Sequence, residues 1–564
     1  MLMTLASSYD EVPYSSYPFS QSHPDRLATI AALFGMAAAP VDRCRVLELG
    51  CSSGGNLIPI AVQFPESQFV GVDFSRVELD QASSLVSALN LKNVELLHRN
   101  ILELNADLRP FDYIIAHGVY SWVPDVVQDR ILSLCSELLA PMGVAYISYN
   151  TYPGWHMRGM IRDMMSYRTA GLQRPEDRVR QGRGLLDFLA QSVPSKESAY
   201  GMLLSDELEQ MRSKEDYYLL HEYLEEINTP IYFHQFIERA TAKGLQYLGE
   251  ADFQVMASSN FPPQVENTLH SVARDLIEME QYMDFLRNRM FRQTILCRKE
   301  VRLDRSLTPE RMQGLYVATS SRPEVPQPSL VSREPLKFRR PNSTMTTNEP
   351  LVKAAMMHLG DVWPLPMHFT ELLAIARSRL NPDPIVVDTS RITHDARRLA
   401  EPLLRCYGTT HVDLSRTAPQ FTTRVGRCPA VSPLARLQAD TGTGATNYRH
   451  EHVSLNDLER QLMRFLDGRH DRSALIGQLV TQVKAGTLVV HDAGRPVMGS
   501  VQLEAILGSA VDHCLSDLAR KALLHRSSDE GDFHPGGVPA SSSSSGHPDR
   551  PAEPTSDVGW KDLA

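Results

Sequence analysis

Residues 48–57 read Glu48-Leu49-Gly50-Cys51-Ser52-Ser53-Gly54-Gly55-Asn56-Leu57 and directly follow the apolar run Cys44-Arg45-Val46-Leu47. A short apolar strand, a glycine-rich turn and an amphipathic helix, in that order, are typical of α/β proteins that bind a nucleotide-like ligand. Glycine lets the backbone approach the ligand, and the N-terminus of the helix offers free N–H groups. Asp73 ends a second apolar run, 23 positions after Gly50. Because its carboxylate lies beside the first strand, it can accept both hydrogens of a ribose diol. The sequence therefore predicts an adenosine-containing cofactor.

Length and composition narrow the class of protein. A chain of 564 residues is too long for one hydrophobic core, so we expect about three domains. The net charge of −10 argues against bulk electrostatic binding, and we expect no nucleic-acid partner. The seven cysteines form no CxxC pair and no Cys/His cluster, which predicts reduced thiols and no metal site. The N-terminus lacks the features of a signal peptide, and no apolar run reaches membrane-spanning length. We therefore expect a cytoplasmic protein without a membrane span.

The first 154 residues alternate short apolar runs with helical patterns, which is typical of a parallel sheet with crossover helices. The strands are expected at 45–49, 68–72, 94–98, 111–116 and 144–149, and the helices at 56–63, 76–89 and 126–139. Residues 155–230 are polar and helical in period, so we expect a helical insertion there. Residues 231–303 are expected to complete the sheet, with a helix at 233–242 and strands at 245–248 and 290–297.

The C-terminal half has three predicted parts. Residues 304–350 contain a proline-rich stretch with little apolar periodicity, which predicts an extended and mobile linker. Residues 351–525 have mixed signals and are expected to form a separate α+β accessory domain. The tail, 526–564, is rich in Ser, Pro, Gly and Asp and is predicted to be disordered. Within the accessory domain we expect helices at 369–380 and 455–466 and a strand pair at 487–491 and 497–501.

Two cofactor classes fit a glycine-rich turn behind a first strand: nicotinamide dinucleotides and S-adenosylmethionine (SAM). The dinucleotide fingerprint is present only in a degraded form, Gly50-x-Ser52-x-x-Gly55. The third strand ends in His98-Arg99-Asn100-Ile101, where methyltransferases usually place an acidic or amide side chain for the adenine amino group. Residues 111–122 resemble the fourth strand and substrate-facing loop of class I methyltransferases. The last two predicted strands offer a reversed hairpin that nicotinamide-binding sheets lack. These features favour SAM.

The likeness extends to one bacterial group within this class. Residues 9–27 resemble the opening of class I methyltransferases that carry a methyltransferase regulatory domain, a group that includes rickettsial protein lysine methyltransferases acting on outer-membrane proteins. Further similar motifs are Glu48–Asn56, His117–Pro124, Tyr149–His156, His221–Glu225, Asp284–Thr294 and, more loosely, Phe465–Arg469. The resemblance implies an α/β fold: a Rossmann-like, seven-stranded class I methyltransferase sheet with a helical insertion. It also implies a C-terminal α+β, winged-helix-like domain and SAM as the cofactor.

The resemblance assigns cofactor contacts to individual residues. Gly50, Ser52 and Gly54 would let the backbone approach the ribose and methionine portions of SAM. Glu48 would orient the loop or reach the methionine ammonium through water, and Asp73 would bind the ribose diol. The other expected contacts are Asn100 with the adenine amino group, Phe74 and Ile101 with the ring faces, and the carbonyl of His117 with the methionine portion. Asparagine at a strand end also caps turns, so Asn100 has a structural alternative.

Aromatic and amide residues follow the fourth and fifth strands, where α/β sheets place substrates. The candidate catalytic residues are Tyr120, Asn150 and Tyr152, and the candidate substrate-rim residues are Trp122, Trp155, Tyr14 and Tyr17, the last two on the N-terminal arm. An aromatic rim suits a lysine, because it binds the cation and can lower an ammonium pKa of about 10.4 by partial desolvation. Core packing is the structural alternative for these aromatic residues. None of them is clearly a catalytic base, so solvent is left to take the proton.

By resemblance, the methyl acceptor is a lysine side chain of a protein, and an outer-membrane or surface protein is the expected partner. The residues alone leave the acceptor open, because a rim of aromatic and amide groups also fits small molecules. A second alternative is a binding protein that senses SAM without turnover. The oligomeric state stays open too, with a homodimer as one alternative.

Overall fold

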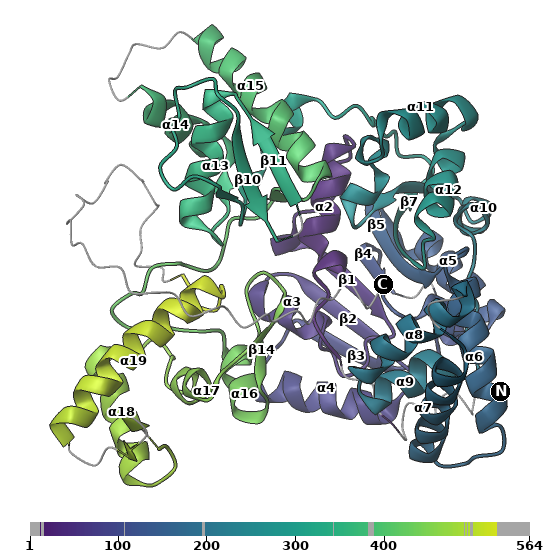
Figure 1. Cartoon of the computed structure of the whole chain (residues 1–564), viewed down its shortest axis with the longest axis horizontal. Coiled ribbons are helices and arrows are strands. Elements are labelled where there is room, and N and C mark those ends of the chain that lie inside the picture. Colours follow the sequence, from purple (N-terminus) through teal and green to yellow (C-terminus); the bar gives the residue numbers. More distant parts are fainter. Residues whose placement is uncertain are drawn as a thin grey trace.

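The structure is a computed structural model that describes residues 12, 16–105, 108–194, 198–341, 343–381, 389–489, 491–492, 495–496 and 500–526. A seven-stranded mixed sheet lies at its centre (Figure 1). In spatial order its strands are β3 (Val94–His98), β2 (Gln68–Asp73), β1 (Arg45–Leu49), β4 (Phe111–Ala116), β5 (Leu139–Asn150), β7 (Phe291–Arg298) and β6 (Leu245–Glu250). Strands β1 to β5 are parallel, whereas β7 is antiparallel to β5 and β6. The predicted class I sheet with its reversed final hairpin is confirmed.

Side-chain alternation divides the core of the sheet between two faces. In β1, Val46 belongs to one buried cluster, and Leu47 and Leu49 belong to the other. The helices on the first face are α2 (Pro24–Leu33) and α3 (Leu57–Gln63), and those on the second are α5 (Asp125–Leu138) and α10 (Phe233–Ala242). Three further helices surround the sheet: α4 (Arg76–Ala88), α11 (Pro263–Val272) and α12 (Leu276–Arg287). Because both faces are covered, the central strands β1 and β4 are buried along almost their whole length.

Residues 155–230 form the predicted helical insertion. Its helices are α6 (Trp155–Thr169), α7 (Pro175–Ser192), α8 (Ala199–Arg212) and α9 (Asp216–Leu224), grouped at the lower right of Figure 1. They share a core of their own, which includes Ile161, Leu204 and Leu219. The insertion is therefore a packed helical unit rather than a loop.

The expected linker at 304–350 is wrong, because this segment is folded. It contains β8 (Tyr316–Ala318), β9 (Arg322–Pro323), β10 (Leu336–Arg340) and β11 (Ser343–Thr347). Strands β9 to β11 form a three-stranded sheet, and β8 forms another with β12 (Met367–His368) and β13 (Asp413–Ser415). Phe338, Leu336 and Val317 are buried and supply apolar contacts, which the high proline content of the segment did not lead us to expect.

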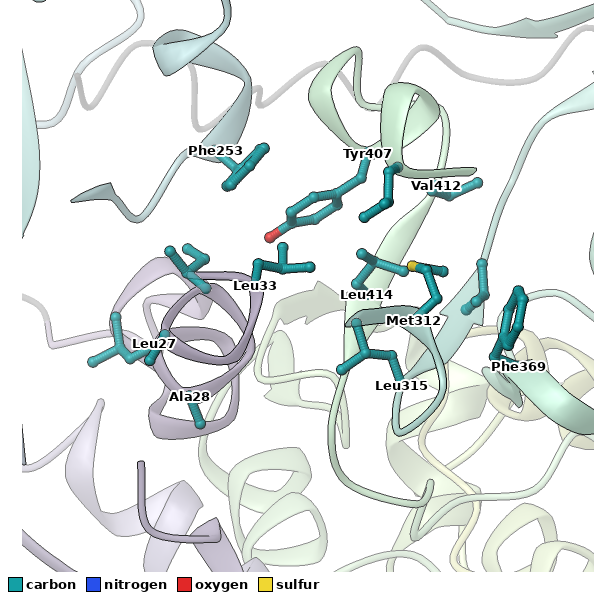
Figure 2. Packing of buried hydrophobic residues seen from close by; sticks show 14 of the residues in the cluster. Leu27, Ala28, Leu33, Phe253, Met312, Leu315, Phe369, Tyr407, Val412 and Leu414 are labelled. Atoms are coloured by element: carbon teal, nitrogen blue, oxygen red, sulfur yellow. The ribbon is translucent and has the colours of Figure 1, made fainter. Parts of the chain in front are cut away.

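The single accessory domain predicted at 351–525 is also wrong, because the region divides in two. Helices α13 (Pro350–Val362), α14 (Phe369–Leu380) and α15 (Thr389–Gly408) share the buried cluster of α2 and the sheet. Figure 2 shows Leu33 of α2 close to Tyr407 of α15 and Leu414 of β13. This part is therefore continuous with the core of the sheet.

The remaining part has a separate core, with Leu475, Leu507 and Leu518 at its centre. Its elements are α16 (Pro433–Thr441), β14 (Gly444–Thr446), β15 (His452–Ser454), α17 (Asp457–Met463), α18 (Arg472–Lys484), β16 (His491–Asp492), β17 (Arg495–Pro496) and α19 (Ser500–Arg520). The structure has a short strand pair, β16 with β17, which overlaps the first predicted strand, 487–491, only at His491. The second, predicted at 497–501, is wrong where it is described, because Ser500 and Val501 begin α19; residues 490 and 497–499 lie outside the described residues. The tail predicted from 526 lies outside them beyond Arg526.

Candidate active site

A cavity of about 310 Å³ lies at the carboxyl ends of the central strands. Its wall combines the loops after β1, β2, β3 and β4, the segment before α2, and helix α9. The predicted site residues that line it are Glu48, Gly50, Ser52, Asp73, Phe74, Asn100, Ile101, His117, Trp122 and Asn150. Its volume falls in the range of small-molecule and cofactor sites. The topology thus brings the predicted residues of four separate loops to one place.

The turn after β1 uses backbone conformations that favour glycine. Gly50 has a φ of +73°, and a Cβ added there would lie 2.4 Å from Cγ2 of Val119. Ser52 also lies in the left-handed region, with a φ of +48°. Its backbone N–H donates to Oδ2 of Asp73 over 2.8 Å, and its hydroxyl donates to Oε2 of Glu78 over 3.0 Å. These bonds hold Ser52 in a conformation that a residue with a side chain rarely adopts.

Asp73 has a structural task beside the one predicted for it. Its Oδ1 accepts the backbone N–H of Ser75 over 2.9 Å, while its Oδ2 accepts that of Ser52. The carboxylate therefore ties the loop after β1 to the loop after β2. A carboxylate fixed in this way faces the cavity without having to be ordered on binding, which suits a diol ligand.

Glu48 presents a buried carboxylate with one unpaired oxygen. Its side chain is buried, and Oε1 accepts Nδ2 of Asn56 over 2.8 Å. Within the described residues, Oε2 has no hydrogen-bond partner. Burial, together with the negative charge of Asp73, raises the pKa of Glu48 to about 8. A cation or a donor arriving in the cavity would satisfy this oxygen, so Glu48 fits the methionine ammonium of SAM or a water bound to it.

The part of the cavity wall formed by the loops after β2 and β3 is more apolar than the part around Glu48. Phe74, which is partly exposed, and Ile101 line it beside Asn100. Asn100 caps a short helical turn, since its Oδ1 accepts the N–H of Leu102 over 3.0 Å. The structural alternative for Asn100 is therefore real, and it coexists with a position on the cavity wall. Adenine binding by these residues stays a prediction.

The N-terminal arm forms part of the wall through residues that the sequence did not single out. Phe19 stacks on the ring of His117 with 3.8 Å between centroids. The hydroxyl of Ser16 accepts the N–H of Gly55 over 2.8 Å, and a Cβ at Gly55 would meet the backbone of Ser16 at 2.4 Å. Burial of His117 lowers its pKa to about 3, so its ring is neutral. The similarity of residues 9–27 to one bacterial group was the signal that could have located Ser16 and Phe19.

Helix α9 supplies three cavity residues that were also missed: Tyr218, His221 and Glu222. His221 is buried. Its Nε2 donates to the carbonyl of Val12 over 2.8 Å, and its Nδ1 lies 3.2 Å from Oε2 of Glu225. The motif His221–Glu225 had been part of the family resemblance, which was again the available signal.

Several predicted site residues lie away from the cavity. Tyr120 is fully buried between Tyr149 and Phe236, and burial raises its pKa to about 12, so its expected place beside the acceptor is wrong. Tyr152 does not line the cavity and stacks on His156 with 4.1 Å between centroids. Trp155 is buried behind Trp122, against which its ring packs edge-on. Core packing is therefore observed for Tyr120 and Trp155, whereas Tyr152 is half-buried outside the cavity.

Three positions remain from the predicted set. Gly54 does not line the cavity; its φ is +80°, and a Cβ there would meet Ile58 at 2.5 Å, so its role is in the turn. Tyr17 packs edge-on against His452 with 5.3 Å between centroids. Tyr14 lies outside the described residues.

Across the described ranges, no group of three or more His, Cys, Asp or Glu side chains is arranged to hold a metal ion. Every helix described is too short or too polar to cross a lipid bilayer.

Comparison with known families agrees with this architecture. Residues 46–143 match a methyltransferase domain, residues 215–298 match a predicted methyltransferase regulatory domain, and residues 428–523 match the C-terminal winged helix domain of PKMT. The fold and the cavity define a class I methyltransferase, and its cofactor is SAM.

Individual relatives place the chain more narrowly. An uncharacterized protein of Rickettsia prowazekii is 35% identical over 524 residues, which cover 92% of this chain and 93% of the relative. The structure of PKMT2 from Rickettsia typhi in complex with AdoHcy (S-adenosylhomocysteine) matches with a TM-score of 0.81 and 30% identity, over 91% of this chain and all of that one. The chain belongs to this family of SAM-dependent methyltransferases with a regulatory domain and a PKMT winged helix domain.

Proposed function

We propose that this chain transfers methyl groups from SAM to lysine side chains of a protein, and that helix α9 binds the acceptor lysine. The observation that carries the proposal is the presence of Glu222, His221, Asn150 and Trp122 in the same cavity as the loop after β1. A carboxylate, an amide and an aromatic ring are groups that recognise an ammonium.

The charges around α9 support a cationic acceptor. Arg158 pairs with the carboxylates of Glu207 and Glu222. Arg162 donates to the backbone carbonyls of Glu222 and Glu225 and interacts electrostatically with the carboxylates of both. Arg158 lies 3.6 Å from Glu207 and 3.5 Å from Glu222. In this cluster the carboxylates outnumber the guanidinium groups, and Glu222 is the carboxylate that lines the cavity. A further positive charge is therefore favourable at this wall.

For methyl transfer to an amine, these residues must align the acceptor nitrogen with the methyl group and accept its proton. Bound SAM supplies an activated methyl group on a sulfonium sulfur, and the carbon–sulfur bond breaks as the nitrogen–carbon bond forms, leaving a neutral thioether. The ammonium must lose its proton before its nitrogen can attack. Burial raises the pKa of Glu222 in spite of Arg158 and Arg162, which makes its carboxylate a better proton acceptor. Asn150, held by the hydroxyl of Ser121 and by Asn228, would orient the amine.

The direct test is incubation with radiolabelled SAM and lysate fractions, including outer-membrane and surface proteins, the partners we propose. Label in an alkali-stable protein band, mapped to lysine by mass spectrometry, is the expected result. Label in a small-molecule fraction would replace the lysine proposal with a small-molecule acceptor. Tight SAM binding without label in any fraction would favour the SAM-sensing alternative.

A matched pair of variants tests the role of α9. We expect Glu222→Gln to lower kcat/KM for the acceptor by about 10- to 100-fold, because the variant loses the charge that holds and deprotonates the amine. The affinity for SAM should stay within twofold. Glu226→Gln changes an exposed carboxylate just after the end of α9 and serves as the control. Equal acceptor kinetics for the two variants would remove Glu222 from the acceptor site.

We also propose that the chain acts in the cytoplasm. All seven cysteines are free thiols and six of them are buried. Such thiols are typical of a reducing compartment.

A further inference from the structure

We propose that His450 of the winged helix domain is a positioning residue of the SAM site, acting through Asn56 on Glu48. This goes beyond the proposed acceptor and does not depend on it. The three residues come from two domains, and His450 and Asn56 are 394 positions apart in the chain. The argument starts from the amide of Asn56, which lines the cavity and is buried.

The hydrogen bonds of Asn56 determine which end of its amide group faces Glu48. Its Oδ1 accepts the backbone N–H of Phe19 over 2.9 Å, the hydroxyl of Ser22 over 3.2 Å and Nε2 of His450 over 2.8 Å. Since the N–H of Phe19 can only donate, this atom must be the carbonyl oxygen. The amide nitrogen therefore faces Glu48 and donates to its Oε1 over 2.8 Å. The N–H groups of Phe19 and His450, together with a hydroxyl of Ser22 that also lies 3.0 Å from the carbonyl of Phe19, hold one end of the amide so that the other end holds the carboxylate.

The tautomer of His450 follows from the same geometry. Nε2 must carry the proton, because Oδ1 of Asn56 is an acceptor. Nδ1 has no hydrogen-bond partner among the described residues, and burial keeps the ring neutral by lowering its pKa well below its usual range. Among the residues that the structure describes, the one hydrogen bond of this buried imidazole goes to Asn56 in the cavity wall, which packing alone explains poorly.

The backbone at His450 adds a second, independent observation. Its φ is +59°, in the left-handed region that non-glycine residues rarely adopt. Asn447 holds the strained turn, since its Oδ1 accepts the N–H groups of Arg449 and Glu451, each over 2.9 Å, and its Nδ2 donates to the carboxylate of Glu451. The winged helix domain thus uses a stabilised, strained turn to direct one side chain at Asn56.

The consequence concerns the unpaired oxygen of Glu48. With Oε1 held by Asn56, Oε2 of this cavity-lining residue is buried and has no hydrogen-bond partner in the described part of the chain. Loss of the His450 bond would leave Oδ1 of Asn56 to Phe19 and Ser22 alone, so the amide, and with it the carboxylate of Glu48, would be held less firmly before SAM binds. The winged helix domain therefore contributes to the cofactor site through the hydrogen bond from His450 to Asn56.

Three substitutions of His450 separate positioning from packing. His450→Gln keeps an N–H donor at a similar reach. His450→Leu removes the donor while keeping a similar volume, and His450→Asn tolerates the left-handed turn but is too short to reach Asn56. His452→Leu, two residues away, is the control, because His452 makes no bond to Asn56.

The readout is the affinity for AdoHcy, measured by calorimetry on the full chain, alongside the melting temperature. We expect His450→Leu and His450→Asn to weaken binding about 5- to 10-fold, the effect of one lost buried hydrogen bond, and His450→Gln to stay within twofold. The KM of any acceptor should be unchanged, so failure of the lysine proposal would not affect this test. If His450→Leu does not fold, His450→Asn decides. Wild-type affinity for His450→Asn, or equal loss in His450→Gln, would overturn the proposal.

Discussion

Burial governs the behaviour of Glu48, because an ionised carboxylate with one oxygen unpartnered among the described residues is costly in the interior of the protein. Its folded pKa is about 8, compared with about 4.3 for an unperturbed glutamate. Between these values the native state binds a proton that the unfolded state has lost. The free energy of unfolding therefore falls as pH rises from about 4.5 to 8, the reverse of a salt-bridged carboxylate.

Glu48→Gln tests this argument. The variant cannot ionise but can still accept the bond from Asn56, so we expect it to be about 1–3 kcal/mol more stable than the wild type at pH 8 and equally stable below pH 4. Denaturant unfolding without ligand measures the difference. The affinity for SAM should fall in the same variant, and the wild type should release a proton on binding at pH 7, seen by calorimetry in two buffers. Equal stability at pH 8 would contradict the raised pKa.

At the scale of elements, the turn between β1 and α3 determines how closely the backbone approaches the cavity. Gly50 is confined by its left-handed conformation and by Val119, which arrives on the loop after β4. A side chain at position 50 would therefore incur two separate free-energy costs, one from backbone strain and one from the clash with Val119.

We expect Gly50→Ala to weaken AdoHcy binding more than tenfold and to destabilise the protein by about 1–3 kcal/mol. Adding Val119→Ala should restore part of the loss, because it removes the clash but leaves the backbone strain. Calorimetry and thermal unfolding of the two single variants and the double variant measure both terms. A double variant as weak as Gly50→Ala would show that the clash with Val119 is unimportant.

At the scale of the whole molecule, a buried ion cluster joins the last two strands to α12. Arg292 is fully buried and contacts Glu250 over 2.8 Å, Asp284 over 2.8 Å and Glu280 over 3.1 Å. Its guanidinium also lies 3.7 Å from the ring centre of Phe233. The family motif at 284–294 is therefore the centre of a network that closes the sheet.

Arg292→Leu should lower the stability of the sheet by about 3–5 kcal/mol, since three buried carboxylates would lose their main partner. The stability of Arg292→Lys should lie between those of the wild type and Arg292→Leu, because a lysine keeps the charge but not the forked geometry of the guanidinium. The urea midpoint, followed by circular dichroism, measures the order of the three proteins. An unchanged midpoint for Arg292→Leu would contradict a role for the cluster in stability.

Local sequence was enough for the sheet and for bringing most of the predicted cofactor residues to one cavity. The strand-turn-helix at 45–63 and the carboxylate at Asp73 are encoded within short windows, where apolar periodicity and glycine act directly on the backbone. The same reasoning erred at 304–350, where proline outweighed the few apolar residues that pair the strands. It also misplaced Tyr120 and Trp155, because a single chain does not reveal on which side of a loop an aromatic ring is buried.

What the sequence by itself determined, then, is the class of fold, its cofactor and the residues at the strand ends. Only the tertiary structure decided that the arm residue Phe19, helix α9 and His450 meet around that cofactor site. The physical reason is that these contacts join segments far apart in the chain. Each segment's local pattern is satisfied equally well by core packing, so only the closed fold distinguishes a site residue from a buried one.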